Sequence, residues 1–159
     1  MKKQTIKKVL NFLEKKEKKI TPFRWKLTNN EQLTEEELNI KGNLKLAQSN
    51  ITSLPKGLNV SGYVDLIDCQ NLKSIQEELY VTEDLYLGGC INLESLPNNS
   101  FVGGDVHLEY CENITSIPPG LKIGGNLIIF KTPLTKFSDD ELLDMIKPDG
   151  YIKGKISRL

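Results

Sequence analysis

The side chains with the strongest potential for catalysis or metal binding are three cysteines and a single histidine. Cys69, Cys90 and Cys111 follow one another at intervals of 21 residues, and His107 lies shortly before the last of them. A zinc site needs cysteines separated by about two to four residues, with further ligands, and a catalytic thiol needs an adjacent base. Neither pattern is present. We therefore expect three free, buried thiols in a row of small side chains, and no catalytic residue, metal or cofactor.

Acidic and basic residues are equal in number, 21 of each in 159 residues, but they are unevenly distributed. Between Asn59 and Glu112 there are ten acidic residues and one lysine, a net charge of −9, whereas residues 1–26 have a net charge of +8. The zero overall charge argues against a protein that coats nucleic acid. Paired acids could share a proton, but the chain contains no phosphate-binding loop or nucleophile motif. We therefore predict that the protein is not an enzyme.

Several features of the chain bear on its location. No apolar run approaches the ~18 residues of a membrane span. The basic N-terminus is not followed by the apolar segment of a secretory signal. An odd number of cysteines without a disulfide pattern suits a reducing compartment. We therefore expect a cytoplasmic protein.

An internal repeat of 20 or 21 residues organises the middle of the chain, and we call each repeat a coil. Its centre is a triplet of alternating apolar residues that recurs five times: Leu44-Lys45-Leu46, Val64-Asp65-Leu66, Leu85-Tyr86-Leu87, Val106-His107-Leu108 and Leu127-Ile128-Ile129. Apolar residues before and after the triplet keep the same register, and glycines and Leu-Pro pairs mark the bends. One coil cannot bury its apolar side alone, so we expect stacked coils with parallel strands about 4.8 Å apart.

The pattern V-x-G-x-L-x-L-x-x-C-x-N-L-x-x-L-P resembles the leucine-rich repeat family, whose core is L-x-x-L-x-L-x-x-N/C-x-L. It is most similar to the short bacterial and phage repeats that contain Leu-Pro, over residues 38–137. One departure is that the first consensus leucine falls on residues such as Lys41 and Gly103, with the apolar residue one place earlier. The resemblance implies a β-rich solenoid with a parallel sheet of about five coils and a concave, ligand-facing surface.

The residue between the two apolar positions of each triplet should face outward. Parallel stacking places equivalent residues side by side, so acids and tyrosines of the middle coils should share one surface. Tyrosines among charges are common in recognition surfaces. The predicted partner-binding residues are Tyr63, Asp65, Asp68, Asp84, Tyr86, Asp105, His107, Glu109 and Tyr110. Because these side chains should point outward, changing Asp65, Asp84 and Asp105 to lysine is expected to leave the fold intact.

Both ends of the stack need covers, and we predict three parts: residues 1–37, 38–137 and 138–159. In the first part, apolar residues between Ile6 and Leu13 predict a capping helix ending near Lys19, and the alternation of Phe23, Trp25 and Leu27 predicts a covering strand. Residues 38–137 form the five-coil solenoid. In the last part, Ser138 and Glu141 predict a capped helix, and a final strand follows it.

These features favour a non-enzymatic protein–protein interaction module whose acidic face binds a basic protein. One alternative is a phage- or bacteria-encoded inhibitor that acts as an acidic decoy at the nucleic-acid site of a host enzyme. Another is a membrane-surface protein that uses its basic N-terminal helix, although a solvated capping helix is favoured over membrane contact. Direct nucleic-acid binding is not expected. The partner and the oligomeric state are not determined by the sequence.

Overall fold

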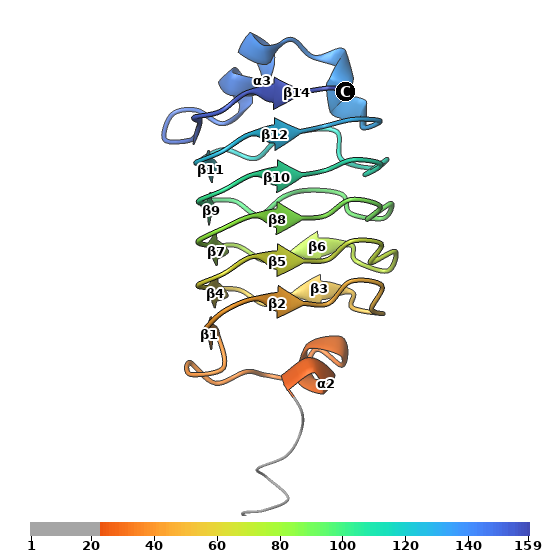
Figure 1. Ribbon diagram of the computed structural model, residues 1–159, viewed down its shortest axis with the longest axis vertical. Helices are drawn as coiled ribbons and strands as arrows, with labels where there is room; N and C mark the ends of the chain where they lie inside the picture. The colour runs from red at the N-terminus through yellow and green to blue at the C-terminus, as the bar shows by residue number, and fades with distance from the viewer. Residues whose placement is uncertain (1–22) are drawn as a thin grey trace, which may run out of the picture.

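The computed structural model describes residues 23–159, which form a stack of coils with a helical segment at each end (Figure 1). Each of the five coils contributes one short strand to each of two six-stranded parallel sheets, and the C-terminal segment contributes the sixth strand of each. The first sheet contains β1 (Asn39–Ile40), β4 (Asn59–Val60), β7 (Tyr80–Val81), β9 (Phe101–Val102), β11 (Lys122–Ile123) and β13 (Tyr151–Ile152). The second sheet contains β2 (Leu44–Lys45), β5 (Val64–Asp65), β8 (Leu85–Tyr86), β10 (Val106–His107), β12 (Leu127–Ile128) and β14 (Ile156–Ser157).

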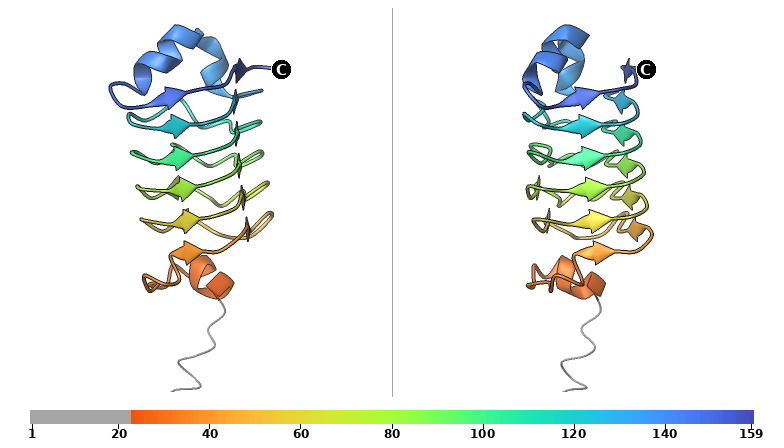
Figure 2. Two further views of the ribbon diagram at one scale, coloured as in Figure 1. Left: turned by 60° about the vertical axis from the view of Figure 1, so that its left-hand side comes forward. Right: turned by 90° about the vertical axis from the view of Figure 1, so that its left-hand side faces the viewer.

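The predicted β-rich solenoid with parallel strands is confirmed. Successive strands of the first sheet pair at intervals of 20, 21, 21, 21 and 29 residues. The predicted triplets form the second sheet in the expected register, so that Leu44 pairs with Val64 and Val64 pairs with Leu85. The stack runs straight in all three views rather than curving into the concave surface that the family resemblance implies (Figures 1 and 2).

The sequence analysis predicted one strand in each coil, and the structure has a second. The first sheet is seen from its edge in Figure 1 and faces the viewer in the right-hand view of Figure 2. It forms around the apolar residue upstream of each triplet, for example Val60 and Val81, which are fully buried. With only two residues in each strand, this sheet lacks the run of alternating residues from which a strand is recognised.

A third, two-stranded sheet joins β3 (Ser53–Leu54) and β6 (Ser74–Ile75) on the remaining side of the first two coils. The backbone N–H of Gln76 donates to the carbonyl oxygen of Leu54 there. The next two coils have Pro97 and Pro118 in place of Gln76. Since proline has no N–H to donate, these coils cannot extend the third sheet in the same way.

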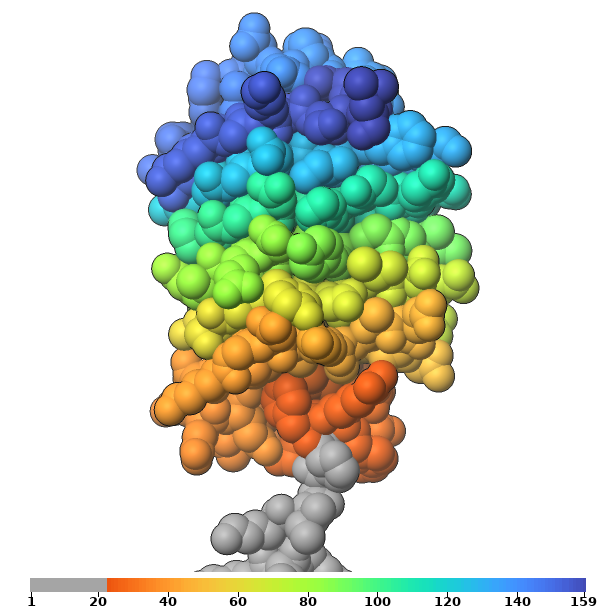
Figure 3. Space-filling model, in the orientation of Figure 1, coloured from red at the N-terminus to blue at the C-terminus, as the bar shows by residue number. Residues whose placement is uncertain are grey.

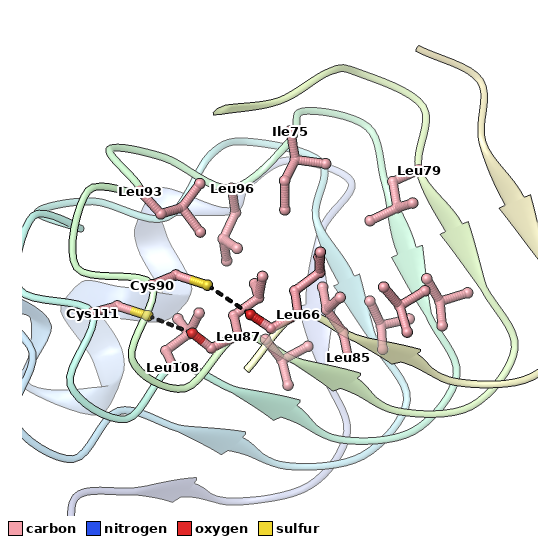
Figure 4. Packing of buried hydrophobic residues seen from close by; sticks show 14 of the residues in the cluster. Leu66, Ile75, Leu79, Leu85, Leu87, Cys90, Leu93, Leu96, Leu108 and Cys111 are labelled. Carbon is pink, nitrogen blue, oxygen red and sulfur yellow. Dashed lines mark hydrogen bonds between the residues drawn. The ribbon is translucent and has the colours of Figure 1, made fainter. Parts of the chain in front are cut away.

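Leucine, isoleucine and valine side chains from every coil fill the space between the sheets in one continuous core (Figure 4). In the third coil, for example, Leu85, Leu87 and Leu93 are all buried. Fully burying one such side chain contributes roughly 1.5–3 kcal/mol. This core fixes which residues of each coil face inward and therefore which are free to face a partner.

The bend between the first and second sheets is built on hydrogen bonds from one coil to the next. Side-chain oxygens of Asn43, Asp84, Asp105 and Asn126 accept the backbone N–H of Tyr63, Asp105, Asn126 and Lys155, at 3.1, 2.8, 2.7 and 2.9 Å respectively. The residue before each of these N–H groups is a glycine. A Cβ at Gly62, Gly104, Gly125 or Gly154 would lie 2.0–2.5 Å from the accepting oxygen. The glycine is thus required because the side chain from the preceding coil occupies its Cβ position.

The second coil shows the converse of this rule. It has Tyr63 where the others have asparagine or aspartate, and the coil above it has Glu83 in place of glycine. With no amide or carboxylate oxygen of Tyr63 in the way, a residue with a Cβ is accommodated. Glycine at this bend therefore depends on the residue type one coil earlier.

The N-terminal end differs from the prediction. Phe23, Trp25 and Leu27 lie in a helix, α2 (Phe23–Thr28), so the predicted covering strand is wrong. Phe23 and Leu27 are four residues apart and lie on the same side of a helix. Leu27 is buried in the core, whereas Trp25 is 47% exposed. The helix predicted between Ile6 and Lys19 lies outside the described residues.

The C-terminal helix is confirmed as α3 (Asp139–Met145). Ser138 Oγ accepts the N–H of Glu141, and the Glu141 carboxylate accepts the N–H of Ser138 at 2.7 Å, as the capping-box prediction requires. The short 3₁₀ helix η1 (Pro133–Lys136) precedes α3. The predicted final strand is two short strands, β13 and β14, which add a further level to both sheets.

We predict that Gly104→Ala lowers the free energy of unfolding by about 1–3 kcal/mol, as overpacking of a tight site commonly does. The added Cβ would meet Asp84 Oδ1 at 2.1 Å. Glu83→Ala, at the equivalent bend of the preceding coil, is the matched control and should stay within about 0.5 kcal/mol of the parent. Urea denaturation measures both. Equal effects of the two changes would contradict the steric rule for this bend.

Candidate functional site

The outward surface of the second sheet, which we call the second-sheet face, contains the residues predicted to bind a partner. The pairing register places Lys45, Asp65, Tyr86, His107, Ile128 and Ser157 in one column across the six strands. Tyr63, Asp84 and Asp105 precede this column at the bend, and Glu109 follows it. Asp68 and Tyr110 lie at the opposite corner, where both adopt left-handed backbone conformations. Figure 3 shows the molecule from the side of this face.

An aromatic row crosses three coils of the second-sheet face. The rings of Tyr63 and Tyr86 meet edge to face with centroids 5.9 Å apart, and the rings of Tyr86 and His107 stack at 4.8 Å. Each of these three side chains is half-buried. Aromatic pairs with this geometry contribute about 0.5–1.5 kcal/mol beyond their area burial. The row is therefore a continuous aromatic strip that is partly exposed to solvent.

Two of the predicted binding aspartates instead support the fold. Asp84 accepts the N–H of Asp105 at 2.8 Å and the Tyr86 hydroxyl at 2.8 Å. Asp105 accepts the backbone N–H of Asn126 at 2.7 Å and also bonds its side-chain amide. The premise that these two side chains are free of structural contacts is therefore wrong, and lysine at either position would remove an acceptor that the fold uses. The bond from Tyr86 to the Asp84 carboxylate raises the pKa of the Tyr86 phenol.

The other predicted acids are either bonded within their own coil or exposed. Asp65 is half-buried and accepts the N–H of Ile67 at 3.1 Å within its own coil. Glu109 Oε1 lies 3.1 Å from His107 Nδ1, so these two side chains pair on the face. Asp68 is exposed. Glu112, which the site prediction omitted, is also exposed, and it lines an open depression at the edge of the second-sheet face together with Asp68, Glu109 and Tyr110.

The acids of the middle coils do not all share this face. Glu77 and Glu78 lie on another side of the coil, where Lys56 Nζ approaches their carboxylates at 3.6 and 3.3 Å. Glu94 lies on the side of the stack that carries the third sheet. Its N–H donates to the carbonyl of Lys73, the residue directly before β6. The charge of −9 counted along the sequence is therefore divided between several surfaces, and only part of it lies on the second-sheet face.

Sequence reasoning missed an aromatic pair on the first sheet. The rings of Tyr80 and Phe101 stack with centroids 4.7 Å apart and an angle of 23° between their planes. Tyr80 is 49% exposed. Their spacing of 21 residues, equal to the repeat, was the available signal. The spacing alone could not predict that the two rings stack, because nothing in the sequence showed that these residues form strands.

The three cysteines are free, fully buried and bonded to the preceding coil. The thiols of Cys69, Cys90 and Cys111 donate to the carbonyl oxygens of Leu46, Leu66 and Leu87 at 3.0, 3.1 and 3.1 Å. Figure 4 shows the bonds of Cys90 and Cys111. Burial raises the pKa of the Cys111 thiol to about 12, and it raises the pKa of Cys90 as well. A thiol that stays protonated is a poor nucleophile. The expectation of a row of three free, buried thiols is therefore confirmed.

Two further observations concern the described part of the chain alone. Among residues 23–159, no group of three or more His, Cys, Asp or Glu side chains is arranged to hold a metal ion. No helix in this range is both long enough and apolar enough to cross a membrane.

The chain matches no protein-family model, no curated protein and no solved structure. The similarity to leucine-rich repeats therefore stays a prediction, and the site is interpreted from its own geometry.

We predict that a thiol reagent labels the native protein slowly at about pH 8, since all three thiols are buried and burial raises the pKa of the Cys90 and Cys111 thiols. All three sites should react rapidly after unfolding in guanidinium. Mass spectrometry of the labelled protein counts the modified cysteines. Rapid labelling of all three thiols in the native state would contradict the burial of Cys69, Cys90 and Cys111.

We predict that Asp105→Ala destabilises the fold by about 1–2 kcal/mol, toward the lower end of the cost of a donor left without its partner, because this donor is only partly buried. The change removes the acceptor of the Asn126 N–H. Asp105→Asn keeps one side-chain carbonyl oxygen and should cost clearly less. Urea denaturation distinguishes the two variants, and equal losses would show that the charge, and not the hydrogen bond, matters at this position.

Proposed function

We propose that the protein is a non-catalytic interaction module that binds a basic protein surface on its second-sheet face. The observation that supports this most is the aromatic row of Tyr63, Tyr86 and His107, bordered on the same face by Asp65 and Glu109. Tyrosine is one of the residue types that contribute most to binding energy at protein interfaces.

Charge and shape favour a basic macromolecule as the partner. Acids on one face attract a basic surface over a range of about 8–10 Å at physiological salt and raise the association rate. They repel phosphate backbones, which disfavours direct binding of nucleic acid. An open sheet surface does not enclose a small substrate in the way that an enzyme pocket does. Three free thiols suit a reducing compartment, so we propose a cytoplasmic location.

The test neutralises acids of the face that the fold does not need. Asp68→Asn, Glu109→Gln and Glu112→Gln together remove three negative charges and preserve side-chain shape. Glu77→Gln, Glu78→Gln and Glu94→Gln together make the same change in net charge on other surfaces. Parent, face variant and control variant are used as baits in affinity capture from a lysate of the producing cell, followed by quantitative mass spectrometry.

We expect a basic protein that is captured by the parent and by the control variant but at least about tenfold less by the face variant. Raising the salt from about 50 to about 500 mM should weaken its capture. A partner that binds all three baits equally would overturn the proposal for this face. Competition by added DNA or RNA would instead favour a decoy of a nucleic-acid site. The membrane alternative depends on residues outside the described part of the chain.

A further inference from the structure

One depression interrupts the second-sheet face, and it results from a missing side chain. The column that follows the outward residues is Ala47, Ile67, Gly88, Glu109 and Phe130. Only Gly88 in this column lacks a side chain. An open depression of about 460 Å³ lies at this place, with Gly88 and Gly89 among the residues that line it.

The fold does not require glycine at position 88. A Cβ there would meet only Glu109, at 3.7 Å from its backbone oxygen and 3.9 Å from its side chain, which are ordinary contacts. Gly89 is different, because its φ is +76° and a Cβ would lie 2.2 Å from Asp68 Oδ1. Backbone conformation and close contacts thus require glycine at position 89 but not at position 88. Packing does not require the space above Gly88 to stay empty.

The walls of the depression combine exposed apolar side chains with carboxylates. Ile67, Ile91 and Tyr110 line it and are 40%, 37% and 46% exposed, which places them among the most exposed large hydrophobic residues of the described chain. Exposed apolar groups that gather around a hollow commonly mark an interaction site.

Three carboxylates, those of Asp68, Glu109 and Glu112, also line the depression. A ligand that packs against the apolar side chains and pairs with the carboxylates needs an apolar stem and a cationic end. Arginine and lysine have this form, because their methylene groups pack on apolar surface while the charged end remains near solvent or an acid.

We propose that the depression above Gly88 is an anchor pocket for one arginine or lysine side chain of the partner. This inference rests on the proposed function and specifies it. The stem of the inserted side chain contacts Ile67, Ile91 and Tyr110, and its cationic end lies among the three carboxylates. A buried anchor of this kind supplies affinity, whereas the remaining acids of the face chiefly steer association.

The test uses a short peptide with one arginine between glycines, blocked at both ends, and the same peptide with citrulline. Citrulline has nearly the same shape as arginine but no charge. Each is titrated into ¹⁵N-labelled protein, and the amide shifts are followed by NMR. We expect saturable shifts centred on Gly88, Gly89 and Tyr110 with the arginine peptide, and at least tenfold weaker binding of the citrulline peptide.

Gly88→Leu fills the depression and should weaken binding of the arginine peptide at least tenfold. Ala47→Leu is the matched control, because it enlarges the side chain at the same strand position away from the depression and should leave binding unchanged. The NMR spectrum reports whether each variant is folded. If Gly88→Leu proves unfolded, Gly88→Ala is used in its place and should weaken binding at least threefold.

Shifts spread evenly over all acidic residues, equal binding of the two peptides, or full binding by the filled variant would each overturn the anchor pocket. The same variants distinguish this failure from that of the proposed function. If the captured partner is lost with the neutralised face but retained with Gly88→Leu, the face binds the partner without this pocket. If the neutralised face retains the partner, the proposed function itself fails.

Discussion

Stacking of identical backbone levels is the constraint on which the rest of the structure depends. No coil can bury its apolar side alone, so every level must repeat the same inward positions at the same register. The pairing of Leu44 with Val64, and of each following level with the next, satisfies this requirement over six strands. A shift of one residue would turn the leucines outward. Within the repeats, 20 or 21 residues are therefore enough for one circuit of the core.

This constraint extends beyond the apolar core to the polar groups at the corners. The levels are close enough that a side chain of one coil enters the space of the next, which is why Asp84 and Gly104 form a unit. The thiol of Cys90 likewise donates to the carbonyl of Leu66 one coil below. Polar residues at such positions are part of the stack even where they border solvent. Charge at the surface is thus not by itself a sign of function in this fold.

The period predicted the second sheet well, because the triplets alternate and their register is independent of local structure. It did not predict the first sheet, whose strands of two residues are too short to show alternation. The residues of the second-sheet face could be assigned from alternation alone. Whether their carboxylates were free could not be predicted, because the bond from the Asn126 N–H to the Asp105 carboxylate joins residues 21 positions apart. The depression could not be predicted from the sequence either, because it lies where Gly88 has no side chain.

Stacking determines the residue type at some surface positions and leaves it free at others, and only the second kind points to a binding role. Asp84, Asp105 and Gly89 are explained by contacts with neighbouring coils. Gly88 and the exposed Ile67 are not, although both lie on the same surface. A repeat that could place a side chain at position 88 without strain, as four other coils do in this column, instead leaves a hollow between apolar and acidic walls. The proposed binding role rests on such positions, since the fold accounts for the others.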